Sequence, residues 1–96
     1  MKEDTAFRFD QKKNAILQNE RGVCFDDVIY AIETGNILDI TEHHNKEKFA
    51  HQRCMVVNID GYACLVPYIE NEEGIFLKTI YPSRKATKRY LKTEIN

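Results

Sequence analysis

The chain has 96 residues, of which 43% are hydrophobic and 30% are charged, and its formal net charge at pH 7 is −1. This length and composition predict one folded domain over residues 1–96 and argue against a disordered chain. No apolar run is long enough to cross a membrane and the first residues are charged rather than signal-like, so we expect a cytoplasmic protein without a membrane partner.

The first third of the chain predicts one short strand and two helices. Alternating apolar residues between positions 6 and 10 predict the strand. Asp10 can then cap a helix that runs to about Arg21 and ends at Gly22. A second helix, ended by Gly35, is predicted from an apolar stripe at helical spacing: Phe25, Val28, Ile29 and Ile32.

The remainder predicts a meander of three or four strands and a last helix. Apolar residues at 37–40 can start the sheet, and the polar stretch 41–51 is expected to be a loop or a frayed edge. Residues 53–59 are predicted to form a strand. The pair Asp60-Gly61 predicts a hairpin, with strands at 62–70 and 75–81 after it. Pro67 should mark a bulge or a position that needs no N–H donor, and Ser83 should cap the last helix. We therefore predict an α+β domain with its helices gathered on one face of an antiparallel sheet.

Two features of composition bear on function. Cys24, Cys54 and Cys64 are odd in number and lack C-x-x-C spacing, so we expect reduced, buried thiols and neither a metal site nor a cofactor. Residues 1–77 carry eight Lys and Arg against fourteen Asp and Glu, a net charge of −6, whereas residues 78–96 carry six against one, a net charge of +5. This asymmetry indicates an anionic partner for the basic end, although a solvated helix face would have the same composition.

Three segments resemble a known family. The opening Phe9-Asp10-Gln11-Lys12-Lys13-Asn14, followed by Gly22-Val23-Cys24-Phe25-Asp26-Asp27, is similar to the start of the BrnT group of RelE-like toxins. The segment Pro82-Ser83-Arg84-Lys85-Ala86 resembles the Ser-Ala-Arg-x-Ala stretch that closes the same family, and the strand Gln52-Arg53-Cys54-Met55-Val56-Val57 fits between them. The chain departs from the family at Glu20-Arg21, where Lys-His is usual, and near Thr79, where the last strand usually carries an arginine. Cys24 also stands where a Ser cap is usual, and Pro82 and Tyr90 replace the Ser and Glu of the closing segment.

The resemblance implies a RelE-like fold and the toxin of a type II toxin–antitoxin system. Such a toxin is a metal-independent endoribonuclease that cuts RNA, free or on the ribosome, to inhibit translation. Its partners are RNA and a cognate antitoxin protein. Lys13 is the catalytic candidate that the family match carries, although the adjacent Lys12 is an equal candidate to face the site.

The chemistry of metal-free RNA cleavage suggests further residues. The 2′-hydroxyl must lose a proton, the leaving 5′-oxygen must gain one, and the charged phosphorane must be stabilised. Arg84 at the strand-to-helix junction and Arg53 at the start of a strand are candidates for the phosphate, and either can instead be a surface charge. His44, among His43, His44 and His51, is the best histidine for proton transfer, unless these are plain loop residues. A basic face suits the RNA backbone or antitoxin carboxylates: Lys85, Lys88 and Arg89.

Two other readings stay open from the sequence. One is a non-catalytic module that grips nucleic acid or a protein with the same basic helix. The other is a toxin of the same fold that acts on a protein target such as gyrase. RNA binding without cleavage would favour the first, and intact RNA with disturbed DNA supercoiling would favour the second.

Overall fold

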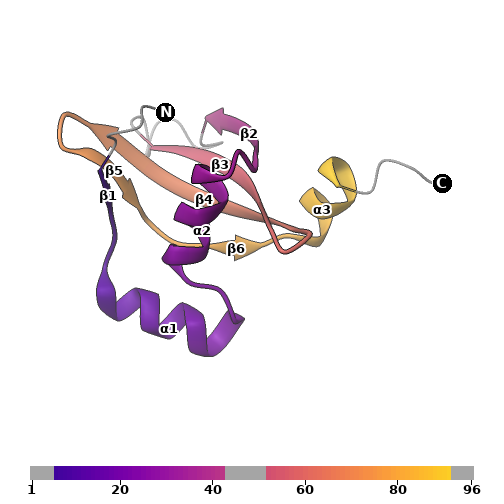
Figure 1. The fold of residues 1–96 in the computed structure, drawn as a ribbon, viewed down its shortest axis with the longest axis horizontal. Helices are drawn as coiled ribbons and strands as arrows, with labels where there is room; N and C mark the ends of the chain where they lie inside the picture. Colours follow the sequence, from indigo (N-terminus) through magenta and orange to yellow (C-terminus); the bar gives the residue numbers. More distant parts are fainter. Residues whose placement is uncertain (1–5, 43–51, 92–96) are drawn as a thin grey trace.

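The computed structural model of this chain describes residues 6–42 and 52–91. Its elements in chain order are β1 (Phe7–Arg8), α1 (Gln11–Arg21), α2 (Phe25–Glu33), β2 (Ile37–Glu42), β3 (Gln52–Ile59), β4 (Tyr62–Asn71), β5 (Gly74–Leu77), β6 (Tyr81–Pro82) and α3 (Arg84–Tyr90). The strands form one sheet in the order β1-β5-β4-β3-β2, and β6 pairs with β4 (Figure 1). The predicted α+β class is confirmed. The antiparallel meander is extended by β1, which pairs with β5 in parallel, and by the short β6.

The two N-terminal helices begin and end where the sequence predicts. The Asp10 side chain accepts hydrogen bonds from the backbone N–H groups of Lys12 and Lys13, at 2.8 and 3.3 Å, and Gly22 ends α1 in the left-handed conformation. In α2 the predicted stripe faces the sheet, with Phe25 and Val28 fully buried. The first turn of α2 closes on itself because the Asp27 carboxylate accepts from the backbone N–H of Cys24 at 3.0 Å.

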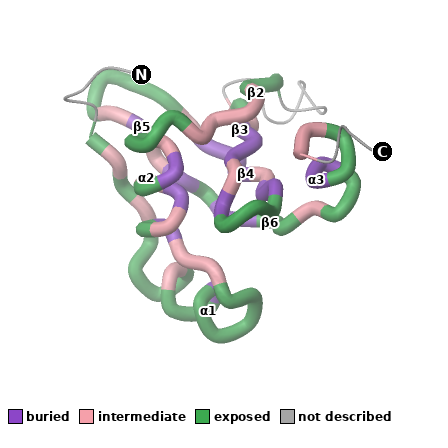
Figure 2. The backbone as a smooth tube through the Cα atoms, turned by 45° about the vertical axis from the view of Figure 1, so that its right-hand side comes forward, coloured by how far each residue is buried: buried purple, intermediate pink, exposed green. Residues whose placement is uncertain are grey.

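The sheet is covered on both faces, which corrects the prediction that all helices gather on one face. The main core lies between α2 and the side of the sheet that carries Met55, Val57 and Val66. The opposite side carries Val56 and Ala63, and α3 packs there. Successive residues of a strand point to opposite faces, so the run of buried residues from Met55 to Val57 requires cover on both sides. Figure 2 shows the buried residues concentrated in the strands and α2, whereas α1 is mostly exposed.

The strand predicted over 75–81 is two strands with a break between them. Both β5 and β6 pair with β4, at opposite ends of it. Between them the carbonyl of Pro67 accepts from the backbone N–H of Lys78 at 2.9 Å. Because the N and the carbonyl of one strand residue point to the same side, the nitrogen of Pro67, which has no hydrogen, also faces this break. The proline thus sits where the ladder lacks a regular partner strand.

Two turns depend on backbone conformations that favour glycine. The hairpin between β3 and β4 has Asp60 at φ 53° and Gly61 at φ 83°, the pair of positive values that a type I′ turn requires. Gly74 at φ 121° starts β5, and a Cβ atom there would lie 2.3 Å from the carbonyl oxygen of Ala6. That carbonyl accepts from the N–H of Ile75 at 2.9 Å, so the bare backbone of Gly74 lets the chain ahead of β1 approach β5.

The three cysteines are free thiols, as predicted, but only Cys64 is fully buried. Burial raises the pKa of the Cys64 thiol to about 11, and burial is also the largest cause of the raised pKa values of Cys24 and Cys54. A raised pKa keeps a thiol protonated and a poor nucleophile at neutral pH. None of the described helices is long and apolar enough to cross a membrane.

Candidate nucleic-acid interface

The site residues predicted from the sequence and described by the structure lie in three separate elements, α1, β3 and α3. Lys12 and Lys13 are exposed in the first turn of α1. The basic residues of the last helix are also exposed, at the opposite end of the molecule from α1 (Figure 1): Arg84, Lys85, Lys88 and Arg89. His44 lies outside the described residues, as do His43 and His51.

Arg53 and Arg84 are on different faces of the sheet. Arg53 of β3 lies opposite Tyr68 of β4, whose side chain belongs to the core under α2. On its other side Arg53 lies opposite Glu42 of β2. Burial raises the pKa of the Tyr68 phenol, and the nearby Arg53 guanidinium acts in the opposite direction. Arg84 begins α3, which packs on the other face. The two arginines predicted as phosphate ligands therefore lie on opposite sides of the sheet.

A groove beside α1 gathers a different set of residues. It has a volume of about 460 Å³ and lies between one side of α1 and the segment that joins β5 to β6. We call it the α1 groove, and its lining residues are Asp10, Lys12, Lys13, Ile16, Leu17, Glu20, Arg21, Thr79 and Tyr81. Both lysines of the sequence prediction therefore belong to it, whereas Arg53 and the residues of α3 do not.

Arg21 joins the two walls of the α1 groove. Its guanidinium donates to the backbone carbonyl of Ile80 at 2.5 Å and lies 5.1 Å from the centre of the Tyr81 ring. The Tyr81 side chain stays 47% exposed and that of Ile16 stays 51% exposed. A guanidinium held by one carbonyl still has other N–H groups, so Arg21 can bind a phosphate while it orders the groove.

The charges of the α1 groove favour an anion with an aromatic or apolar part. Three cations, Lys12, Lys13 and Arg21, face two carboxylates, Asp10 and Glu20. Asp10 already accepts two backbone N–H groups as the cap of α1. Tyr81 offers a ring on which a base can stack, and such stacking contributes about 1–3 kcal/mol per base in single-strand binding proteins.

Reasoning from the sequence missed Arg21 and Tyr81. They stand on opposite sides of the groove because of a contact that spans 59 positions of the chain, and no local pattern reports such a contact. Two of the places where the sequence departs from the BrnT-like pattern, Glu20-Arg21 and Thr79, line the α1 groove, whereas the departures at Cys24, Pro82 and Tyr90 lie outside it.

Comparison with known proteins does not identify the chain. No family model matches it, and neither a curated protein nor a solved structure matches it. Within residues 6–42 and 52–91 no group of three or more His, Cys, Asp or Glu side chains is placed to hold a metal ion.

Proposed function

We propose that the chain is the toxin of a type II toxin–antitoxin pair, a metal-independent endoribonuclease with a RelE-like fold that cuts RNA in the α1 groove. The observation that carries the proposal is the convergence of Lys12, Lys13 and Arg21 on one groove that also exposes the ring of Tyr81. The resemblance of the N-terminal segment to BrnT toxins supports it, since that segment forms the wall that carries both lysines.

Each group in the groove has a chemical task in this proposal. Lys12 and Lys13 hold the phosphates of the RNA backbone as exposed point charges. Arg21 stabilises the extra charge of the phosphorane, a contribution of about 3–4 kcal/mol for one well-placed donor group. Glu20 accepts the proton of the 2′-hydroxyl and Lys13 donates one to the leaving oxygen, while Tyr81 stacks on a neighbouring base.

The cognate antitoxin would inhibit by covering the α1 groove. The exposed side chains of Ile16 and Tyr81 give this surface apolar area beside its cations. An antitoxin segment that pairs acidic with apolar residues would match both properties and exclude RNA. In this proposal α3 contributes a second, non-specific basic surface for the RNA backbone.

The test is incubation of the purified chain with a defined single-stranded RNA in the presence of EDTA. We expect cleavage by the wild type and a loss of at least about tenfold in Lys13→Ala, since one positioned catalytic group contributes at least this much. Lys78→Ala is the matched control, because Lys78 is an exposed lysine outside the groove. Arg84→Ala and Arg53→Ala are assayed beside them, because the sequence alone predicted these two arginines as phosphate ligands. Their cleavage activity shows whether either arginine contributes to the reaction.

One observation favours a second candidate, a non-catalytic nucleic-acid-binding module. Among the described residues, the lining of the groove contains lysine, carboxylate and phenol groups for proton transfer but no histidine. RNA that stays intact while Lys12→Ala and Lys13→Ala weaken its binding would support this module over the ribonuclease. Intact RNA without binding, together with altered DNA supercoiling, would instead point to a toxin directed at gyrase.

A further inference from the structure

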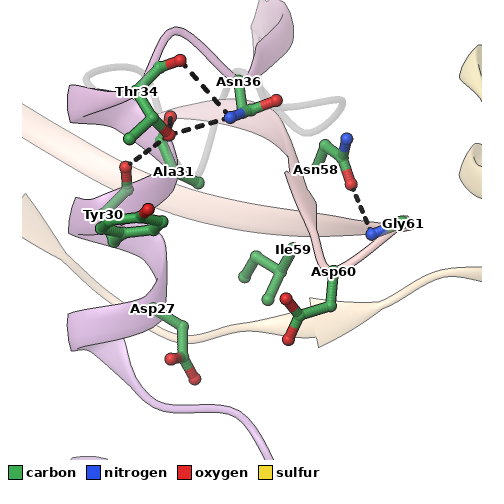
Figure 3. Close-up of a pocket in the computed structure, with 9 residues that line it drawn as sticks. All are labelled: Asp27, Tyr30, Ala31, Thr34, Asn36, Asn58, Ile59, Asp60 and Gly61. Carbon is green, nitrogen blue, oxygen red and sulfur yellow. Dashed lines mark hydrogen bonds between the residues drawn. The ribbon is translucent and has the colours of Figure 1, made fainter.

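A second pocket lies away from the α1 groove and has the opposite charge. It has a volume of about 240 Å³ between α2, the start of β2 and the hairpin that joins β3 to β4 (Figure 3). At about 30 Å³ for each water in the liquid, it has room for roughly eight water molecules or one long side chain. We call it the aspartate pocket; it shares no lining residue with the α1 groove.

Two carboxylates stand on separate walls of the aspartate pocket. Asp27 belongs to the first turn of α2 and Asp60 to the hairpin turn, as Figure 3 shows. One oxygen of Asp27 is used within α2 by Cys24, and its other oxygen has no hydrogen-bond partner within the described chain. The Asp60 carboxylate likewise has no hydrogen-bond or ion-pair partner among the described residues. The lining contains no lysine or arginine, so its formal charge is −2.

The remaining polar groups of the pocket mainly hold its walls in place. Asn58 accepts from the N–H of Gly61 at 2.8 Å and so fixes the hairpin turn that carries Asp60. Asn36 donates to the hydroxyl of Thr34 at 2.8 Å, and its backbone carbonyl accepts from the N–H of Asn58 at 2.9 Å. These bonds tie the end of α2 to β3, and the two carboxylates are left to bind a ligand.

Tyr30 adds an aromatic wall. Its side chain lies one helical turn after Asp27 and is 69% exposed, the largest exposure among the large hydrophobic residues of the described chain. An aromatic ring beside carboxylates suits a cation that is planar and has several N–H groups, because it can stack on the ring and donate to both acids. A lysine ammonium would also neutralise the carboxylates, but it lacks the planar set of N–H donors that can stack on the ring and bind both acids at once.

We propose that the aspartate pocket binds an arginine side chain presented by a partner protein, with the guanidinium between Asp27 and Asp60 and against Tyr30. Nucleic acid is excluded as the occupant by the charge of the pocket. The charge of −2 on the lining complements a basic partner. The proposal does not rest on the ribonuclease, since the two surfaces have no residue in common.

The test is a titration of the full ¹⁵N-labelled chain with a short capped peptide, Gly-Arg-Gly, followed by NMR. We expect saturable shifts of the amide signals of Asn58, Asp60 and Gly61. The same peptide with citrulline in place of arginine, which keeps the shape and removes the charge, should produce none. Lysine in that place should bind about threefold more weakly, since it lacks the planar donor set.

Variants connect the shifts to the pocket. Asp60→Asn keeps a residue that tolerates the positive φ of the turn and should weaken arginine binding about tenfold. Tyr30→Ala, at an exposed helix position, should weaken it about fivefold. Glu72→Gln, an exposed acid in the turn between β4 and β5, is the matched control and should have no effect.

Four outcomes would overturn the proposal. They are the absence of saturable shifts, equal shifts with the citrulline peptide, unchanged affinity in both Asp60→Asn and Tyr30→Ala, and the same saturable shifts with calcium chloride. The dispersion of each variant's amide spectrum shows whether it is folded, so a binding loss through unfolding is recognised directly. RNA cleavage by the same samples is a separate measurement, and its failure would leave the peptide result intact.

Discussion

Tyr90 and Asp39 join the last helix to the edge strand β2. The Tyr90 hydroxyl donates to one carboxylate oxygen of Asp39 at 2.6 Å, and the other oxygen accepts from the N–H of Ile40 at 2.8 Å. The hydrogen bond from Tyr90 is the largest cause that lowers the pKa of Asp39 below its usual value, and the same bond raises the pKa of the Tyr90 phenol. The Tyr90 hydroxyl thus has a structural role, because its hydrogen bond to Asp39 joins α3 to β2.

These directions predict how Tyr90→Phe changes stability with pH. A lowered carboxyl pKa stabilises the folded state above the ordinary value, about 3.9, and this contribution is lost as the pH falls through the folded-state pKa. A raised phenol pKa stabilises below the ordinary value, about 10, and this contribution is lost as the pH rises through the folded-state pKa. Urea unfolding of wild type and Tyr90→Phe should therefore differ most between about pH 5 and 9. A difference that stays constant down to pH 2.5 would contradict the assignment.

At the scale of elements, α3 is held to the sheet by a buried hydroxyl. Thr87 is 3% exposed, accepts from the backbone N–H of Ala63 at 2.8 Å and donates to the carbonyl of Ser83 at 2.8 Å. Ser83 in turn donates its backbone N–H to the carbonyl of Ala63 at 2.9 Å. These bonds place α3 on the face of the sheet opposite α2.

Thr87→Val should therefore destabilise the fold. It keeps the shape of the side chain but leaves the N–H of Ala63 buried without an acceptor, which costs about 1–3 kcal/mol. Thr87→Ser is the control, since it keeps the hydroxyl and loses one methyl group, worth roughly 0.8 kcal/mol. Chemical denaturation of the three proteins measures both values. Valine as stable as threonine would show that this bond does not hold α3.

The elements that the sequence predicted well are those specified by neighbours along the chain. Asp10 caps α1, the apolar stripe defines α2 and Asp60-Gly61 makes the hairpin, and each signal lies within a few residues of its effect. The break between β5 and β6 and the placement of α3 depend on how distant segments pair with β4. The buried residues on both faces of β3 were a signal for the second layer, but only the sheet partners show which helix provides it.

At the scale of the whole molecule, charge is separated in a way that the sequence showed only in part. The basic end is α3, as the asymmetry predicted, yet a second basic surface forms in the α1 groove from residues of the acidic stretch. Lys12 and Lys13 were predicted because they are neighbours in a family-like segment. Arg21 was not, because its position beside Tyr81 results from the folded chain.

The number of cations in the groove predicts how RNA binding depends on salt. Three phosphates neutralised in the groove contribute about −2 to the slope of a plot of log affinity against log salt, and RNA contacts to α3 add to this slope. Lys12→Ala should make the slope shallower by about 0.7, and Lys78→Ala should leave it unchanged. Fluorescence anisotropy with a labelled RNA over a range of salt concentrations measures both. An equal effect of the two variants would argue against the α1 groove as the site.

Mass spectrometry of the RNA ends after incubation with the purified chain in EDTA would show whether the 2′-hydroxyl is the nucleophile. Attack by the 2′-hydroxyl on its own phosphate leaves a 2′,3′-cyclic phosphate or its hydrolysed form on one fragment and a 5′-hydroxyl on the other. The account predicts these ends with the wild type, a strong reduction with Lys13→Ala, and no cut where the 2′-hydroxyl is replaced by hydrogen. RNA that stays intact both free and on the ribosome, or fragments with a 3′-hydroxyl and a 5′-phosphate, would contradict this mechanism.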